Sequence, residues 1–142
     1  MKILIINGPN LNMLGTREVE KYGNMTLEQM NDIIKENCTE NGRQVDFFQS
    51  NCEGEIVTAI HNSRGNYDGI ILNAGAYTHY SYAIADAVPI AEMPVIEVHL
   101  TNIYARDEFR HKSVISPVCK GLISGFGIDS YILALCYFEN RF

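Results

Sequence analysis

Two pairs of side chains in this 142-residue chain could carry out acid–base chemistry, and one of them lies in the apolar run VIEVH. Glu97 and His99 of this run are two residues apart, so in a strand they project to the same face. A carboxylate there can accept the imidazole N–H, fix the tautomer and hold the ring protonated, as a proton donor requires. The alternative is a buried structural pair, because a glutamate in an apolar strand is costly unless it is paired.

The second pair is Arg17 with Tyr22, in the polar stretch NGPNLNMLGTREVEKYG (7–23). An unperturbed tyrosine has a pKa of about 10 and is a poor base at neutral pH, but a nearby guanidinium favours the phenolate. The sequence predicts this effect if the loop folds back so that the two side chains meet. Otherwise both are exposed residues of a loop that is longer than most strand-to-helix connections.

Short apolar runs that alternate with amphipathic segments must position these groups. The runs predict strands over 2–6, 44–49, 69–72, 95–99 and 121–124. The segments between them predict helices over 26–42, 53–63, 81–88 and 129–140, and a short helix over 104–110. Thr26 and Gln29 form a capping box for the first helix, and Gly42 suits its end. The residues expected on its buried face are Leu27, Met30, Ile33, Ile34 and Cys38.

Strands that alternate with helices indicate a parallel sheet with right-handed crossovers. Residues 1–142 are therefore expected to form a single catalytic domain. Its expected fold is a flavodoxin-like α/β three-layer sandwich with a five-stranded parallel sheet in the order 2-1-3-4-5.

Ligands of such folds bind beyond the carboxyl ends of the strands. The residues that leave the first four strands are rich in amides and imidazoles: Asn7, Ser50, Asn51, Asn73, His79, His99, Thr101 and Asn102. They include no cluster of acids for a metal, and no glycine-rich phosphate motif follows the first strand. The sequence thus predicts an acid–base site with no metal and no cofactor.

The composition limits the binding partners and the cellular compartment that can be expected. A net charge of −6 argues against a nucleic-acid partner, and no segment has the apolar length of a membrane span. The N-terminus lacks the features of a signal peptide. The four cysteines have no metal-binding spacing, so free thiols in a reducing cytoplasm are expected.

Several long blocks of the chain resemble the type II 3-dehydroquinate dehydratases, in order and in spacing. The blocks are NGPNLNMLGTRE, YG, QSN-x-EGE, GIILNAGAYTH, PVIEVHLTNIYARDEFR and SPV-x-KG-x-I-x-GFG. The resemblance implies a cofactor-free hydro-lyase that reversibly converts 3-dehydroquinate to 3-dehydroshikimate. This reaction belongs to the shikimate pathway, which leads to chorismate and the aromatic amino acids. The implied elimination is anti and passes through an enolate.

The resemblance also implies roles for individual residues. Tyr22 takes the C2 proton, and Arg17 keeps Tyr22 ionised on a mobile lid. Asn12 holds a water at the enolate oxygen. His99 protonates the departing C1 hydroxyl and is oriented by Glu97.

Further positions match the substrate-binding residues of that family. They are Asn73, His79, Arg110 and the backbone of Leu100 and Thr101. Asp86 matches a position that reaches the site of a neighbouring subunit in a trimer. Four such trimers form the implied homododecamer.

The chain departs from the family pattern at a few positions. Cys52 stands where His is frequent, Val19 where Pro is frequent, and Tyr80 and Tyr82 where smaller residues are usual. None of these removes a predicted catalytic group. A second interpretation is a catalytically silent relative that binds a cyclic polyhydroxy acid, but a binding protein needs neither a base nor an acid.

Overall fold

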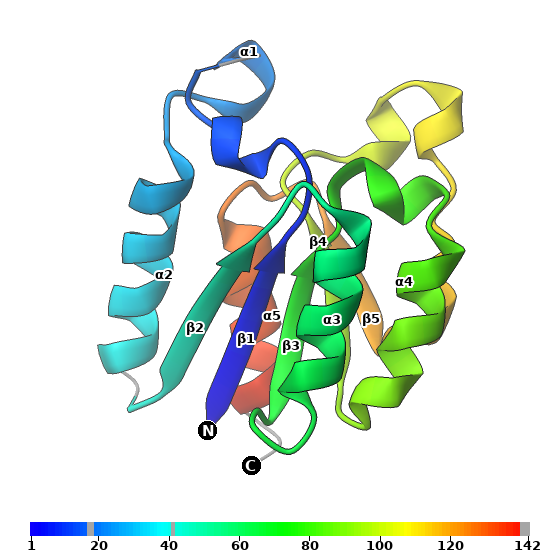
Figure 1. Cartoon of the computed structure of the whole chain (residues 1–142). Coiled ribbons are helices and arrows are strands. Elements are labelled where there is room, and N and C mark those ends of the chain that lie inside the picture. The colour runs from blue at the N-terminus through cyan, green and yellow to red at the C-terminus, as the bar shows by residue number, and fades with distance from the viewer. Residues whose placement is uncertain (17–18, 41, 140–142) are drawn as a thin grey trace.

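A five-stranded parallel sheet in the order β2-β1-β3-β4-β5 forms the centre of the molecule, which confirms the predicted topology (Figure 1). The structure is a computed structural model and describes residues 1–16, 19–40 and 42–139, with the side chains of Tyr22 and Glu40 outside the description. The strands are β1 (Lys2–Asn7), β2 (Gln44–Gln49), β3 (Gly69–Asn73), β4 (Val95–His99) and β5 (Gly121–Ser124).

Helices cover both faces of the sheet and complete the predicted three layers. They are α1 (Val19–Tyr22), α2 (Leu27–Glu40), α3 (Glu53–Ser63), α4 (Tyr82–Ala87) and α5 (Asp129–Glu139). The helices α2 and α5 pack on one face, and α3 and α4 pack on the other (Figure 1). The one-turn helix α1 stands above the carboxyl ends of the strands and covers neither face.

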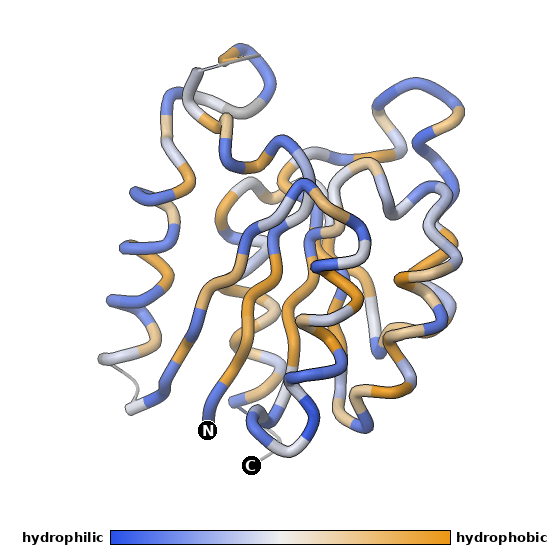
Figure 2. Tube along the Cα trace, viewed as in Figure 1, coloured by the Kyte–Doolittle hydropathy of each residue, from blue (hydrophilic) through white to orange (hydrophobic). Residues whose placement is uncertain are grey.

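Alternate residues of the central strand β1 fill the two halves of the core. Ile3 and Ile5 pack with α2 and α5, whereas Leu4 and Ile6 pack with α3 and α4. Each such side chain contributes about 1.5–3 kcal/mol when it leaves water. The apolar residues accordingly lie in the strands and inner helix faces, and the hydrophilic ones lie at the outer surfaces and loops (Figure 2). In the described part of the chain, no helix is long and apolar enough to cross a membrane.

The capping box predicted at the start of α2 is present. The Thr26 N–H donates to Gln29 Oε1 at 3.0 Å, and the Gln29 N–H donates to Thr26 Oγ1 at 3.2 Å. The prediction of its buried face was wrong at Ile33, whose side chain is 42% exposed. Met30, Ile34 and Cys38 follow the four-residue spacing of one stripe, and Ile33 lies about 100° around the helix from Ile34.

Two predicted helices differ from the structure. The helix expected over 104–110 is two 3-10 turns, η4 (Ile103–Ala105) and η5 (Glu108–Arg110), because the intervening Asp107 has the extended ψ of 145°. The helix expected over 81–88 ends at Ala87. A 3-10 turn, η3 (Val88–Ala91), follows it, since Pro89 has no N–H to continue an α-helical pattern.

The loops that follow β1 and β3 lie in direct contact at the carboxyl end of the sheet. The Gly8 N–H donates to the carbonyl of Asn73 at 2.7 Å. A Cβ on Gly8 would lie 2.6 Å from the backbone carbonyl carbon of Ala74, so only glycine permits this approach. The 3-10 turn η2 (Gly75–His79) then starts at a glycine with φ of 58°. This crossing brings the two loops to one side of a single pocket.

Candidate active site

A pocket of about 110 Å³ opens at the carboxyl end of the sheet, between the loops that follow β1, β3 and β4. Six of the predicted site residues line it: Asn73, His79, His99, Leu100, Thr101 and Arg110. Arg106 lines it as well, and the described residues place no carboxylate in the lining. The pocket therefore suits a small, anionic, polar ligand.

His99 ends β4 at the pocket, and Glu97 lies behind it. Glu97 is completely buried, and His99 is 6% exposed. The Nε2 atom of His99 lies 2.7 Å from Glu97 Oε1. The two side chains thus make the contact that their spacing in the strand predicts.

The Glu97 carboxylate is surrounded by donors. The hydroxyls of Thr78, Ser113 and Ser116 donate to it in addition to His99. Burial by itself raises the pKa of the Glu97 carboxyl, but the hydrogen bonds from His99, Ser116 and Thr78 outweigh burial and hold this pKa below its ordinary value. Glu97 is therefore ionised at neutral pH.

The ionisation of Glu97 decides which nitrogen of His99 carries a proton. A carboxylate can only accept, so Nε2 must be the donor. No hydrogen bond joins Nδ1 of His99 to any of the described residues. Since the ring lines the pocket, Nδ1 is the nitrogen that a ligand can reach.

His79, on η2, presents the opposite nitrogen to its surroundings. Its Nδ1 lies 2.8 Å from the carbonyl of Lys112 and must donate to it. Burial lowers the pKa of His79, and the nearby His99 and Arg110 lower it further. Because the ring is neutral at pH 7, its Nε2 is an acceptor that suits a ligand hydroxyl.

Asn73 is held in one orientation by two partners. Its Nδ2 donates to the phenol oxygen of Tyr131 at 2.8 Å, and its Oδ1 accepts from the N–H of Gly75 at 3.2 Å. Tyr131 in turn donates to Asn7 Oδ1 at 2.7 Å. Burial raises the pKa of this tyrosine, so its hydroxyl stays protonated. One buried phenol thus braces the asparagines that end β1 and β3.

We expect Tyr131→Phe to lower the free energy of unfolding by about 1–3 kcal/mol, the cost of unsatisfied buried polar groups. The substitution removes the donor to Asn7, whose Nδ2 is already buried without a partner among the described residues. Urea unfolding measures the loss. Tyr104→Phe is the control, because its side chain is exposed, and it should change stability by less than about 0.5 kcal/mol. Equal stability of the two variants would show that the hydrogen bonds of the Tyr131 hydroxyl do not stabilise the fold.

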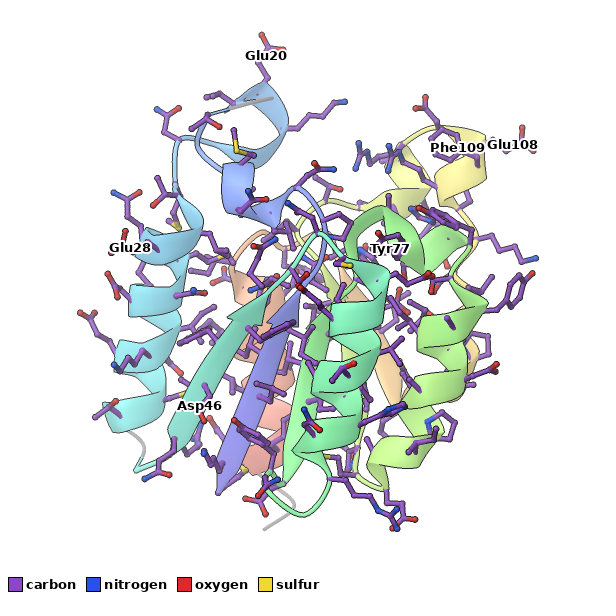
Figure 3. All side chains as sticks on the ribbon, in the orientation of Figure 1. Glu20, Glu28, Asp46, Tyr77, Glu108 and Phe109 are labelled. Atoms are coloured by element: carbon purple, nitrogen blue, oxygen red, sulfur yellow. The ribbon has the colours of Figure 1, made fainter. Side chains whose placement is uncertain are left out.

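Arg110 brings a partly buried positive charge to the pocket. Its guanidinium lies 4.7 Å from the centre of the Phe109 ring, and its Nε is buried without a partner among the described residues. Phe109 projects from the segment opposite α1 at the top of the sheet (Figure 3). Sequence reasoning missed Arg106, although it lies four residues before Arg110 in the same block.

The remaining predicted residues are not in the pocket lining. Asn12 is exposed on the 3-10 turn η1 (Leu11–Met13) and lines a separate groove with Thr16 and Asn31. Asp86 is exposed on α4. Arg17 lies outside the described residues. Tyr22 is the last residue of α1, and its side chain lies outside the description. Figure 3 shows Glu20 of this helix above the sheet.

The loop between β1 and α1 is anchored to the exit of β2. The N–H of Asn10, which adopts φ of 69°, donates to Asn51 Oδ1 at 2.9 Å. Tyr77 of η2 donates to the carbonyl of Asn51 at 2.9 Å. Asn10 and Asn51 therefore fasten the pocket wall, and Asn10 also lines the pocket.

The departures from the family pattern lie away from the pocket lining. Tyr80 is exposed just before α4, Tyr82 is exposed as its first residue, and Val19 is exposed on α1. Cys52 is an exposed free thiol at the start of α3. These residues leave the lining side chains in place.

The chain is similar to known proteins in both sequence and structure. Residues 1–139 match the family model described as dehydroquinase class II. A protein of Clostridium perfringens named 3-dehydroquinate dehydratase is 57% identical over 142 residues, which cover 99% of each chain. One of Caldicellulosiruptor bescii with the same name is 58% identical, over 94% of this chain and 93% of its own. The crystal structure of a type II dehydroquinase from Butyrivibrio crossotus superposes with a TM-score of 0.95 at 48% identity, over 98% of this chain and 97% of its own.

Proposed function

Because this chain belongs to the class II dehydroquinase family and converts 3-dehydroquinate to 3-dehydroshikimate in the shikimate pathway, we propose how its residues divide the reaction. Residues 1–142 act as a single catalytic domain without a cofactor. A base at the end of α1 and an acid at the end of β4 work on opposite faces of the substrate. This division suits an anti elimination.

The first step is removal of the C2 proton by Tyr22. The C3 ketone acidifies this proton, so a phenolate is a sufficient base. Arg17 keeps Tyr22 ionised by favouring its charged form. The electron pair of the C2–H bond moves into an enolate whose negative charge lies on the C3 oxygen. Asn12 holds a water that stabilises this oxygen.

The second step is loss of the C1 hydroxyl, for which His99 is the acid. The enolate re-forms the ketone, a C1–C2 double bond forms and the C1–O bond breaks. The leaving hydroxide takes the proton of His99 and departs as water. The observation that carries this assignment is the pair itself, a buried carboxylate at 2.7 Å from an imidazole that lines the pocket.

The substrate is held by the residues that share the pocket with His99. Asn73, His79 and Arg110 bind its polar groups, and the backbone of Leu100 and Thr101 receives its carboxylate. The basic side chains in the lining support an anionic substrate. The neutral His79 supports a hydroxyl donor beside it.

We expect the purified chain to generate the conjugated enone product, followed by ultraviolet absorbance, and to keep this activity after treatment with borohydride and substrate. An imine mechanism would need a lysine at the substrate, and no described lysine lines the pocket. An enzyme that forms an imine through lysine is the positive control for inactivation. A covalent adduct trapped on this chain would overturn the acid–base assignment, and absence of turnover in the untreated protein would overturn the function.

The assembly and the compartment complete the proposal. The chain forms trimers in which Asp86 reaches the site of a neighbouring subunit, and four trimers form a homododecamer. The exposed position of Asp86 on α4 supports this, and light scattering on the purified protein measures the assembly mass. The enzyme works in the cytoplasm, which the four free cysteines support.

A further inference from the structure

The Glu97 carboxylate accepts hydrogen bonds from three hydroxyls that come from outside its own strand. Ser113 Oγ lies 2.9 Å from Oε1 and 3.0 Å from Oε2. Thr78, on η2, donates to Oε1, and Ser116, on the 3-10 turn η6 (Ser116–Val118), donates to Oε2. With His99, four donors meet at one buried carboxylate.

The backbone fixes the direction of the Ser113 proton. Ser113 Oγ accepts from the N–H groups of Ile115 at 3.2 Å and Ser116 at 2.9 Å. These two bonds fill its lone pairs, so its single proton is left to donate. The Glu97 oxygens are nearer acceptors than Thr78 Oγ1, which lies at 3.2 Å, and the proton therefore points to Glu97. Thr78, His99 and Ser113 contact Oε1, and Ser113 and Ser116 contact Oε2, so both carboxylate oxygens have their full share of donors.

The same segment also fastens the wall of the pocket. The N–H of Val114 donates to the carbonyl of Thr78 at 2.9 Å, and the carbonyl of Lys112 accepts from Nδ1 of His79. Residues 112–116 therefore join η2, which carries His79, to the buried carboxylate behind His99. Removal of one of the hydroxyls therefore affects the imidazole of His99 through one intervening side chain, that of Glu97.

We propose that Thr78, Ser113 and Ser116 are positioning residues of the reaction. They saturate the Glu97 carboxylate with donors. This carboxylate in turn holds His99 by its Nε2–H and turns Nδ1 toward the substrate, so that the protonated ring delivers its Nδ1 proton to the leaving hydroxyl. The inference rests on the proposed role of His99 as the acid. Because Glu97 has no vacant site for a proton, the proton that His99 releases is replaced from the pocket side.

Few other ionisable groups act on this pair. The register neighbours of Glu97, Leu72 of β3 and Leu122 of β5, are apolar, and the register neighbour of His99 is the non-ionisable Ser124 of β5. Among the described residues, the charged or titratable groups that face the pair from the packed elements and the pocket are His79, Arg106, Arg110 and Cys119. Burial raises the pKa of the Cys119 thiol to about 12, so this thiol stays neutral throughout the pH range of an assay.

The test compares Ser113→Ala, Ser116→Ala and Thr78→Val with Thr78→Ser, which restores the hydroxyl. We expect each deletion to lower kcat by about tenfold, part of the about 10²- to 10⁴-fold that a general acid contributes, with KM within about twofold. The acid limb of the kcat–pH profile should move to higher pH. The reason is that loss of a donor raises the pKa of Glu97, and His99 loses its counter-charge once Glu97 is protonated.

Ser63→Ala is the matched control, because its buried hydroxyl donates to the Ile60 carbonyl on α3, remote from the pocket. It should change neither kcat nor the profile. Nitrogen NMR of His99 shows which ring nitrogen carries the proton, and a change in packing alone would not alter this result. In the wild type the proton should be on Nε2, and in Ser113→Ala this preference should be lost. Thr78→Ser should behave as the wild type.

Two outcomes would overturn the inference, and they are distinguishable. If His99→Asn is inactive while the three deletions keep the wild-type kcat, pH profile and tautomer, the hydroxyls serve stability only. If His99→Asn itself turns over normally, the proposed acid is wrong and the inference fails with it. If Ser113→Ala does not fold, the comparison of kcat and the pH profile between Thr78→Val and Thr78→Ser tests the role of the hydroxyls instead.

Discussion

Replacing Tyr22 by Phe is expected to lower kcat by at least about 10²- to 10⁴-fold, the contribution of a positioned general base. Phenylalanine keeps the ring but has no oxygen that can take the C2 proton. Because the substitution removes no group proposed to bind substrate, affinity should persist. Calorimetric titration of the variant with substrate measures the affinity, and the ultraviolet assay measures kcat.

The control for this variant is Tyr104→Phe, which removes an exposed phenol outside the pocket lining. It should keep the wild-type rate. Proton exchange makes the test sharper: the wild type should exchange the C2 proton of the substrate with deuterium from solvent, and Tyr22→Phe should not. A nearly normal kcat in Tyr22→Phe would remove this residue as the base.

The second large effect is expected for His99→Asn, which should also lower kcat by about 10²- to 10⁴-fold. The asparagine amide is shorter than the imidazole and stands in the place of Nδ1, but the hydroxyls of Thr78, Ser113 and Ser116 still donate to Glu97, so the buried charge keeps partners and the fold should survive. The amide cannot release a proton near neutral pH. The loss of rate therefore reports the acid step rather than unfolding.

Deuterium exchange separates this variant from Tyr22→Phe. If His99 acts only at C1, the base still removes the C2 proton in His99→Asn, so deuterium should enter unreacted substrate while product formation stops. His61→Asn, exposed on α3, is the control and should keep the wild-type rate. A His99→Asn variant with a rate within a few-fold of the wild type would exclude His99 as the acid.

Local patterns were sufficient for most of the architecture. The apolar runs and the capping box predicted strands and helices that are present. The reason is that the spacing of apolar residues along a segment reflects which of its side chains are buried. The errors lie where local periodicity is ambiguous. Ile33 lies next to the buried stripe of α2, and 104–110 contains a short apolar–polar pattern that two 3-10 turns satisfy as well as one helix.

The environment of the predicted acid had no comparable local signal. Thr78, Ser113 and Ser116 are ordinary polar residues of turns in the sequence, and Tyr131 is one aromatic residue of a helix. Each acquires its part only from a partner many residues away, such as Glu97 for the hydroxyls and Asn7 for the phenol. The short block SVIS, with the two hydroxyls of Ser113 and Ser116, would have been a weak hint, and Thr78 lies 35 residues earlier in the chain.

The sequence by itself determined the alternation of strands and helices, the family and the spacing that pairs Glu97 with His99, since residues two apart in a strand point to one face. The strand order was expected only from the fold class, and the tertiary structure fixes it. Only the tertiary structure decided that this glutamate is buried among hydroxyl donors and that Nε2 of His99 is the nitrogen it occupies. The physical reason is that the charge of a buried carboxylate depends on every donor around it, and folding brings those donors from segments that are far apart in the chain.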